Sequence, residues 1–145
     1  MPALTPPTMD AHTSFVAAVR EFHAHPDPPP WFAATLDPDR LADPRRFARY
    51  VAGLLAERFE HTPRPAGFVP ATTLWWIDGT EFLGRLAIRH RLTPALEEAG
   101  GHIGYDVRPS ARRRGHATAM LRAALPVAYR LGIDPALLTC DPSNV

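Results

Sequence analysis

Three consecutive arginines, Arg112, Arg113 and Arg114, stand directly before Gly115 and a segment with helical periodicity. Such a turn suits a phosphate group, because a helix N-terminus presents unbonded backbone N–H groups and the positive end of the helix dipole. Glycine also lets the main chain approach a ligand closely. The segment from Arg112 to Thr118 is therefore predicted to bind a diphosphate.

Other phosphate-binding patterns do not occur in this sequence. All 16 basic residues are arginines, so no Walker-type loop with its lysine can form. The sequence also lacks a Gly-x-Gly-x-x-Gly turn between a strand and a helix, and a Gly-x-Ser-x-Gly nucleophile elbow. A solvated basic turn is the alternative, and the glycine with its flanking strand and helix favours a phosphate site.

The N-terminal part of the chain is predicted to be helical. Residues 1–9 contain prolines without an apolar period and are expected to form a mobile leader. A helix is expected from Asp10 to about residue 25, where apolar residues recur every three or four positions. A proline-rich linker then leads to a second helix that begins at Pro44 and ends before residue 63. Residues 10–62 therefore form the helical part.

Residues 68–145 have the pattern of a sheet that carries the basic turn. Branched and aromatic residues at 69–77, followed by Asp78-Gly79, predict a hairpin with 81–91. Trp75 and Trp76 should point to opposite faces of that hairpin. Further elements are expected at 93–98 (one helical turn), 102–107 (strand), 117–131 (helix with a kink or a break at Pro126 and with Gly132 as its C-cap) and 136–140 (strand).

The composition bounds the class of protein. A chain of 145 residues is long enough for one domain, residues 1–145. A formal net charge of +1 argues against nucleic-acid binding, and no stretch of about 18 apolar residues or secretory signal is present. Cys140, the single cysteine, has no partner for a disulfide, and the seven histidines lack metal-ligand spacing. We expect a cytoplasmic protein without a metal, a nucleic-acid partner or a membrane partner.

The spacing Arg112-x-x-Gly115-x-Ala117 resembles the Gln/Arg-x-x-Gly-x-Gly/Ala signature of the GCN5-related N-acetyltransferase (GNAT) family, whose acyl donor is acetyl-CoA. The strand at 103–107, the turn at 108–110 and the later strand followed by Asn144 are similar to the same family. The resemblance implies an α/β (mixed α+β) fold with a central, mostly antiparallel sheet flanked by helices. It also implies an acyltransferase that moves an acetyl group from acetyl-CoA to a primary amine of a small molecule or peptide.

The resemblance also assigns roles to residues. It implies that Tyr105, Asp106 and Val107 line the pantetheine arm of acetyl-CoA and that Asn144 touches this arm. It also implies that the turn binds the diphosphate through Arg112, Arg113, Arg114, Gly115, His116, Ala117 and Thr118.

The general base of the reaction is less defined. Asp106 and His102 share one face of a strand and are both candidates, with Asp106 ranked first and Glu81 behind them. A salt-bridge partner for an arginine is the alternative role for Asp106.

The family continues after its fifth strand with a fourth helix and two further strands, whereas this sequence ends at Val145. We therefore expect a domain without that C-terminal helix and those last two strands. An open sheet edge would then be available for a homodimer. A non-catalytic acetyl-CoA-binding module is the rival function. An RNA-binding module is the third, and the lack of aromatic residues around the arginines argues against it.

Overall fold

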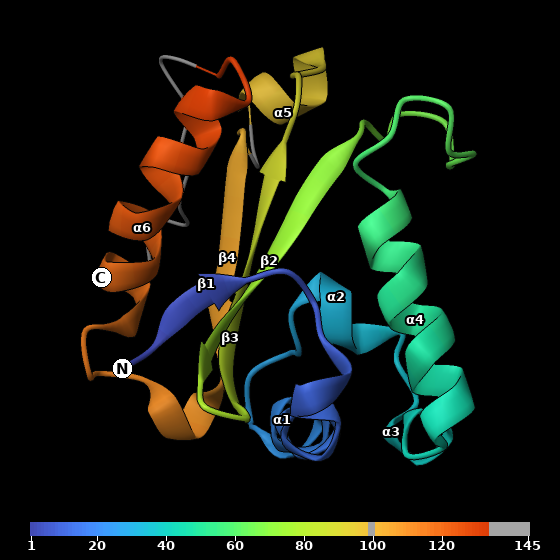
Figure 1. Ribbon diagram of the computed structural model, residues 1–145, viewed down its shortest axis with the longest axis vertical. Coiled ribbons are helices and arrows are strands. Elements are labelled where there is room, and N and C mark those ends of the chain that lie inside the picture. Colours follow the sequence, from blue (N-terminus) through green and yellow to red (C-terminus); the bar gives the residue numbers. More distant parts are fainter. Residues whose placement is uncertain (99–100, 134–145) are drawn as a thin grey trace.

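A four-stranded antiparallel sheet forms the centre of the computed structural model, which describes residues 1–98 and 101–133. Its strands follow the order β1 (Ala3–Thr5), β2 (Ala71–Asp78), β3 (Glu81–Arg89) and β4 (Ile103–Val107) (Figure 1). Helices α1 (His12–Ala24) and α4 (Pro44–Ala56) pack on one face and α6 (His116–Arg130) on the other. This arrangement confirms the expected mixed α/β architecture with a central antiparallel sheet.

The helix at Pro44 begins as predicted. Asp43 caps α4 by accepting a hydrogen bond from the Arg45 backbone N–H, and Pro44 occupies the first turn, where its missing N–H costs nothing. The first helix begins differently from the expectation that Asp10 precedes it as a cap. A 3₁₀ helix, η1 (Met9–Ala11), precedes α1, and the Thr8 side chain caps η1 by accepting a hydrogen bond from the Asp10 backbone N–H.

Two N-terminal predictions are wrong. The expected mobile leader contains β1, which pairs with β2 from Ala3 opposite Ile77 to Thr5 opposite Trp75. The expected linker contains two one-turn helices, α2 (Trp31–Ala34) and α3 (Pro38–Leu41). All three elements are too short to show a hydrophobic period, and β1 forms through contacts with residues about 70 positions away in the chain.

The β2–β3 hairpin is confirmed, with Gly79 at φ +64° in its turn. The register changes between Trp76 and Ile77, so that Leu83 on β3 is an extra residue without a partner on β2. Such a β-bulge bends the strand and turns its carbonyl groups in new directions. The bulge lies at the end of β3 that is next to the connection from β4 to α6.

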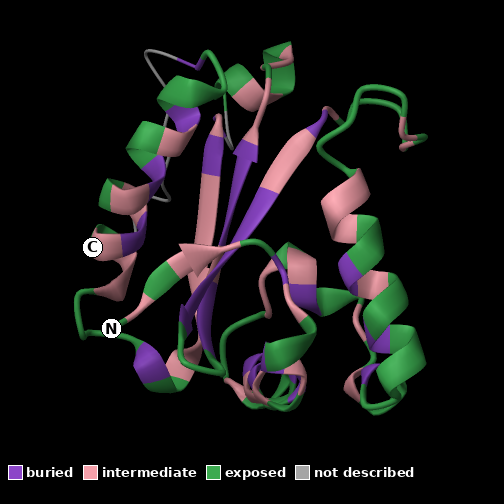
Figure 2. Ribbon diagram, in the orientation of Figure 1, coloured by how far each residue is buried: buried purple, intermediate pink, exposed green. Residues whose placement is uncertain are grey.

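The sheet separates two hydrophobic cores, and the outer surfaces of α4 and α6 are exposed (Figure 2). Phe15 is central to the first core, between α1, α4 and the sheet. Met120 of α6 is fully buried in the second core. Trp75 lies in the first core and Trp76 in the second, which confirms that they point to opposite faces.

The predicted C-terminal elements are present in the described residues. A helical turn, α5 (Pro94–Glu98), precedes β4. The helix α6 continues through Pro126, so the break that was one of the two expected effects of this proline does not occur. Gly132 follows α6 with φ +82°, as expected for a C-cap. The predicted strand at 136–140 and Asn144 lie outside the described residues.

Candidate functional site

A cavity of about 590 Å³ lies where β4 leads into α6, within the size range of small-molecule sites. It is lined by Tyr105, Asp106, Val107, Ala111, Arg112, Arg113, Gly115, His116, Ala117 and Thr118. Every predicted ligand-binding residue of the strand and turn is therefore at this cavity, except Arg114. Ala111 was not predicted, because a small buried apolar side chain carries no chemical pattern.

The backbone of the turn has the geometry of an anion site. Arg113 has φ +63° and Gly115 has φ +79°, whereas Arg114 between them has a negative φ. Turns that change hand in this way bring successive N–H groups together into a concave surface for anions. The first N–H groups of α6 add to this surface, because helix geometry gives them no intrahelical acceptor.

Gly115 is required for its conformation and not for lack of space. A Cβ built at this position would meet nothing within 4 Å. The left-handed backbone of the residue, which is the N-cap of α6, is accessible to glycine at little cost. The close approach of a ligand expected at Gly115 would therefore depend on the backbone angles of this residue, because a side chain would not be excluded for lack of space.

The arginines of the turn have different surroundings. Arg112 donates from Nε to the backbone oxygen of Val107 at 3.2 Å, so its side chain lies along the end of β4. Arg113 lines the cavity through a side chain that is exposed. Arg114 is exposed and does not line it. The positive charge at the cavity therefore comes from Arg112 and Arg113.

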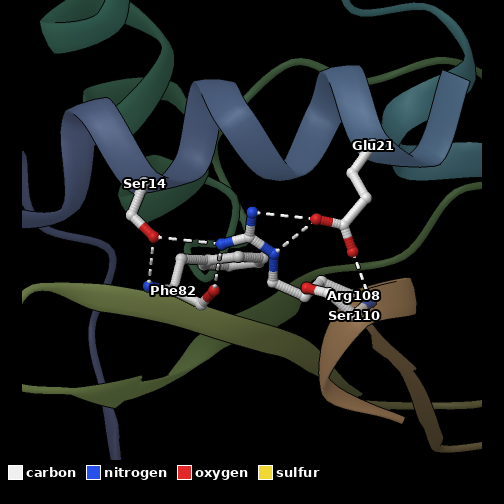
Figure 3. Close-up of polar contacts among 5 residues, drawn as sticks. All are labelled: Ser14, Glu21, Phe82, Arg108 and Ser110. Carbon is white, nitrogen blue, oxygen red and sulfur yellow. Dashed lines mark hydrogen bonds and ion pairs between the residues drawn. The ribbon is translucent and has the colours of Figure 1, made fainter. Parts of the chain in front are cut away.

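Arg108 fixes the connection from β4 to α6 (Figure 3). Its Nε and Nη2 donate to Oε2 of Glu21 on α1, at 3.1 and 3.0 Å, and its Nη1 donates to the Phe82 oxygen at 3.2 Å and to Ser14 Oγ at 3.3 Å. Glu21 also accepts a hydrogen bond from the Ser110 backbone N–H through Oε1. We call these residues the Arg108 network. It ties the segment before the turn to α1 and β3.

The bulge in β3 supplies part of the same attachment. The Arg108 backbone N–H donates to the oxygen of the extra residue, Leu83, at 2.8 Å, beside the Phe82 oxygen that the Arg108 side chain contacts. A regular strand directs neighbouring carbonyl groups in opposite directions. The bulge thus allows both oxygens to bind one arginine.

The electrostatics of Glu21 reflect this network. Partial burial by itself raises the pKa of Glu21, but the hydrogen bonds from Ser110 and Arg108 and the charge of Arg108 outweigh it. The net effect is a pKa below the ordinary value of 4.5. Glu21 is therefore held as a carboxylate that accepts hydrogen bonds.

Asp106 forms an ion pair with Arg85, its cross-strand neighbour on β3, at 3.2 Å. Burial raises the pKa of Asp106, while the charge and hydrogen bond of Arg85 lower it by less. The guanidinium of Arg85 also lies 5.0 Å from the centre of the Phe32 ring. The salt bridge that was the alternative role for Asp106 is therefore present. The raised pKa of Asp106 also suits a general base.

His102 cannot assist Asp106 at one reacting atom. The two residues are four positions apart along an extended segment, which separates their Cα atoms by about 13 Å. Glu81 pairs with Asp78 at the hairpin end, beyond the residues that pair with β4. Among the predicted bases, Asp106 alone lines the cavity.

Sequence reasoning missed two side-chain partners of this site. Arg85 was not singled out, because its pairing with Asp106 depends on strand register. For Trp76 the sequence predicted only that it points to the face opposite Trp75, and the structure shows that its Nε1 donates to Nδ1 of His116 at 3.0 Å. No local signal in the sequence connects residues 40 positions apart.

In the described ranges, no three or more His, Cys, Asp or Glu side chains form a group that could bind a metal ion. No helix in the same ranges has the length and hydrophobicity required to cross a bilayer.

The fold and site define an α/β protein with an arginine-rich turn between a strand and a helix, next to a cavity of about 590 Å³. Residues 16–145 match the sequence profile of the acetyltransferase (GNAT) family, and the chain belongs to this family. Membership indicates acyltransferase activity. A comparison with curated protein sequences found no match.

Proposed function

We propose that the protein transfers an acetyl group from acetyl-CoA to a primary amine of a small molecule or peptide. The observation that carries this proposal is that β4, the basic turn and the first turn of α6 line one cavity together. These three parts match the three parts of the donor. The turn suits the diphosphate, the strand suits the amide-bearing arm, and Asp106 suits the reacting end.

The residues present fit acetyl-CoA. The backbone N–H groups of the turn and the charges of Arg112 and Arg113 would bind the diphosphate. Strand β4 pairs with β3 on one side, and no described strand pairs with its other side. Its backbone groups at Tyr105 and the N–H of Val107 would therefore bind the amides of the pantetheine arm, whereas the Val107 oxygen already accepts a hydrogen bond from Arg112 Nε.

Acyl transfer to an amine requires removal of a proton from nitrogen. A lysine-type amine has a pKa of about 10.4, so a base must take its proton at neutral pH. The nitrogen attacks the thioester carbon, the new N–C bond forms, and the C–S bond breaks with release of the thiolate. Asp106 would accept the amine proton, directly or through one water, and the thiolate would take up a proton to leave as CoA.

Calorimetry with CoA tests donor binding. Gly115→Glu should abolish or greatly weaken binding, because it strains the left-handed backbone and places a negative charge at the phosphate site. Gly115→Asn is the matched control, since asparagine tolerates this conformation and adds no charge. The assignment fails if the wild type shows no binding at millimolar CoA, or if Gly115→Glu binds CoA as tightly as the wild type.

Thiol release from acetyl-CoA in the presence of a panel of primary amines tests the reaction. Asp106→Asn should lower kcat by about 10²–10⁴, the contribution of a positioned base, and leave acetyl-CoA binding within a few fold. Asp39→Asn is the control, because Asp39 pairs with Arg20 on the surface and does not line the cavity. Equal rates for Asp106→Asn and wild type would remove Asp106 from this role.

The ion pair between Asp106 and Arg85 favours a second candidate, a non-catalytic CoA-binding protein. The guanidinium of Arg85 lowers the pKa of Asp106 and so offsets part of the rise that burial causes, which leaves the carboxylate less basic than burial alone would make it. CoA binding that depends on Gly115, without thiol release for any amine of the panel, would support this second candidate.

A further inference from the structure

The contact between Trp76 and His116 has a consequence for the cavity. Trp76 lies on β2 and is only 6% exposed, and His116 is the first residue of α6 and lines the cavity. The indole Nε1 donates to Nδ1 of the imidazole at 3.0 Å. The two rings meet at 67°, with their centres 6.5 Å apart.

This hydrogen bond determines the tautomer of His116. The indole of Trp76 can only donate a hydrogen bond, so Nδ1 of His116 must be the acceptor. In the neutral ring, the proton is then on Nε2. Among the residues that the structure describes, none accepts a hydrogen bond from Nε2 of His116. The ring thus has a hydrogen-bond donor that is available to a ligand.

We infer that Trp76 is a positioning residue for the acyl donor: it holds His116 in the tautomer whose Nε2–H binds a diphosphate oxygen of CoA. The inference rests on the proposed function, because that function supplies the diphosphate. Phosphate oxygens only accept hydrogen bonds, so the other tautomer would present a lone pair to them and repel them. Trp76 thereby contributes to the affinity of the protein for CoA, although it does not line the cavity.

The tautomer is measured first, in the ligand-free protein, from the ¹⁵N chemical shifts of His116 at pH 8. The wild type should show the Nε2–H form. Trp76→Phe, which keeps an aromatic ring and removes the N–H, should show a mixture of both forms. Trp75→Phe, on the opposite face of β2, is the control and should leave the tautomer unchanged. The inference is overturned if the wild type shows the Nδ1–H form or if Trp76→Phe retains the Nε2–H form alone.

A double-mutant cycle on CoA affinity then separates positioning from packing. His116→Ala should weaken CoA binding by about tenfold to a hundredfold, the loss expected for one hydrogen bond to a charged group. Trp76→Phe should weaken it by a smaller factor in the wild type and should have no further effect in the His116→Ala background. An equal loss in both backgrounds would show that Trp76 acts by packing alone and would overturn the inference.

The choice of nitrogen is tested by two further variants. His116→Gln places an amide N–H near the position of Nε2, and His116→Asn places one near Nδ1. The His116→Gln variant should retain more CoA affinity than the His116→Asn variant, and the reverse order would contradict the inference.

The variants should affect CoA and 3′-dephospho-CoA alike, because both ligands contain the diphosphate. An effect confined to CoA would assign the 3′-phosphate instead and overturn the diphosphate assignment. If the wild type binds no CoA, the proposed function fails, whereas the tautomer measurement stands independently.

Discussion

At the scale of single residues, Arg113 is the clearest departure from local preference. It is a non-glycine residue with φ +63°, a conformation that costs an L-residue about 1–2 kcal/mol. Strained residues of this kind concentrate at functional sites, where the surrounding structure imposes them. Because Arg113 also lines the cavity, we attribute the choice of arginine at this position to its positive charge.

Arg113→Gly separates stability from ligand binding. Glycine relieves the left-handed strain, so the melting temperature should remain equal to that of the wild type or rise. CoA affinity should fall by about tenfold, because a hydrogen bond to a charged group is lost. Differential scanning fluorimetry and calorimetry measure the two effects. Arg114→Gly, outside the cavity lining, should bind CoA as the wild type does, and equal losses for both variants would contradict a specific role for Arg113.

At the scale of elements, the site depends on the attachment of the β4–α6 connection to its neighbours. The Arg108 network ties this connection to α1, and the bulge at Leu83 ties it to β3. A second close contact lies beside the bulge. A Cβ on Gly84 would be 2.6 Å from the backbone oxygen of Asp106 and 3.3 Å from the side chain of Met120. The approach of β3, β4 and α6 thus requires glycine here.

Glu21→Gln tests the Arg108 network through pH. The pKa of Glu21 is lowered in the folded state, so its contribution to stability is present above the unfolded value of about 4.5 and is lost as pH falls through the folded value. The variant should lose about 1.5–3 kcal/mol of unfolding free energy at pH 7, and this difference should shrink below about pH 4. Urea unfolding across this range is the measurement. A constant difference at all pH values would disprove the linkage, and Glu97→Gln on α5 serves as the control.

Gly84→Ala should destabilise the protein by about 1–3 kcal/mol, because the added methyl overlaps the backbone of β4 and must separate the strands. The matched control is Gly53→Ala on α4, where a Cβ meets nothing within 4 Å and the better helix propensity of alanine should add about 0.5–1 kcal/mol. Thermal unfolding of both variants gives the comparison. Equal stability of the two variants would mean that β3 and β4 can move apart freely.

At the scale of the whole molecule, one sheet joins two cores. Phe15 contacts the rings of Trp75 and Phe82 in the first core, and Met120 packs against the opposite face in the second. Because both cores share the strands, loss of packing on one face should weaken the other.

Phe15→Ala and Met120→Ala should therefore lower the stability of a single cooperative transition, by about 3–5 and 2–5 kcal/mol respectively. Near-UV and far-UV circular dichroism should give the same midpoint for each variant. Leu125→Ala, at a position 52% exposed on α6, is the control and should change little. Two separate transitions in either core variant would show that the cores unfold independently.

The sequence by itself determined the features that depend on neighbouring residues. The Asp78-Gly79 turn and the alternating residues around it were sufficient for the hairpin, and the proline at the start of α4 was sufficient for that helix boundary. The basic turn before α6 was also found from its own residues. These signals are short-range, since each concerns the backbone angles or side-chain period of one segment.

Only the tertiary structure decided which distant residues meet. It paired β1 with β2, although three residues are too few to show a period. It placed Arg85 opposite Asp106, and it brought the Trp76 indole to the His116 imidazole. The first two of these contacts depend on strand register, and the third depends on how α6 packs on the sheet. Register is set by packing across the whole sheet, and therefore no local pattern encodes it.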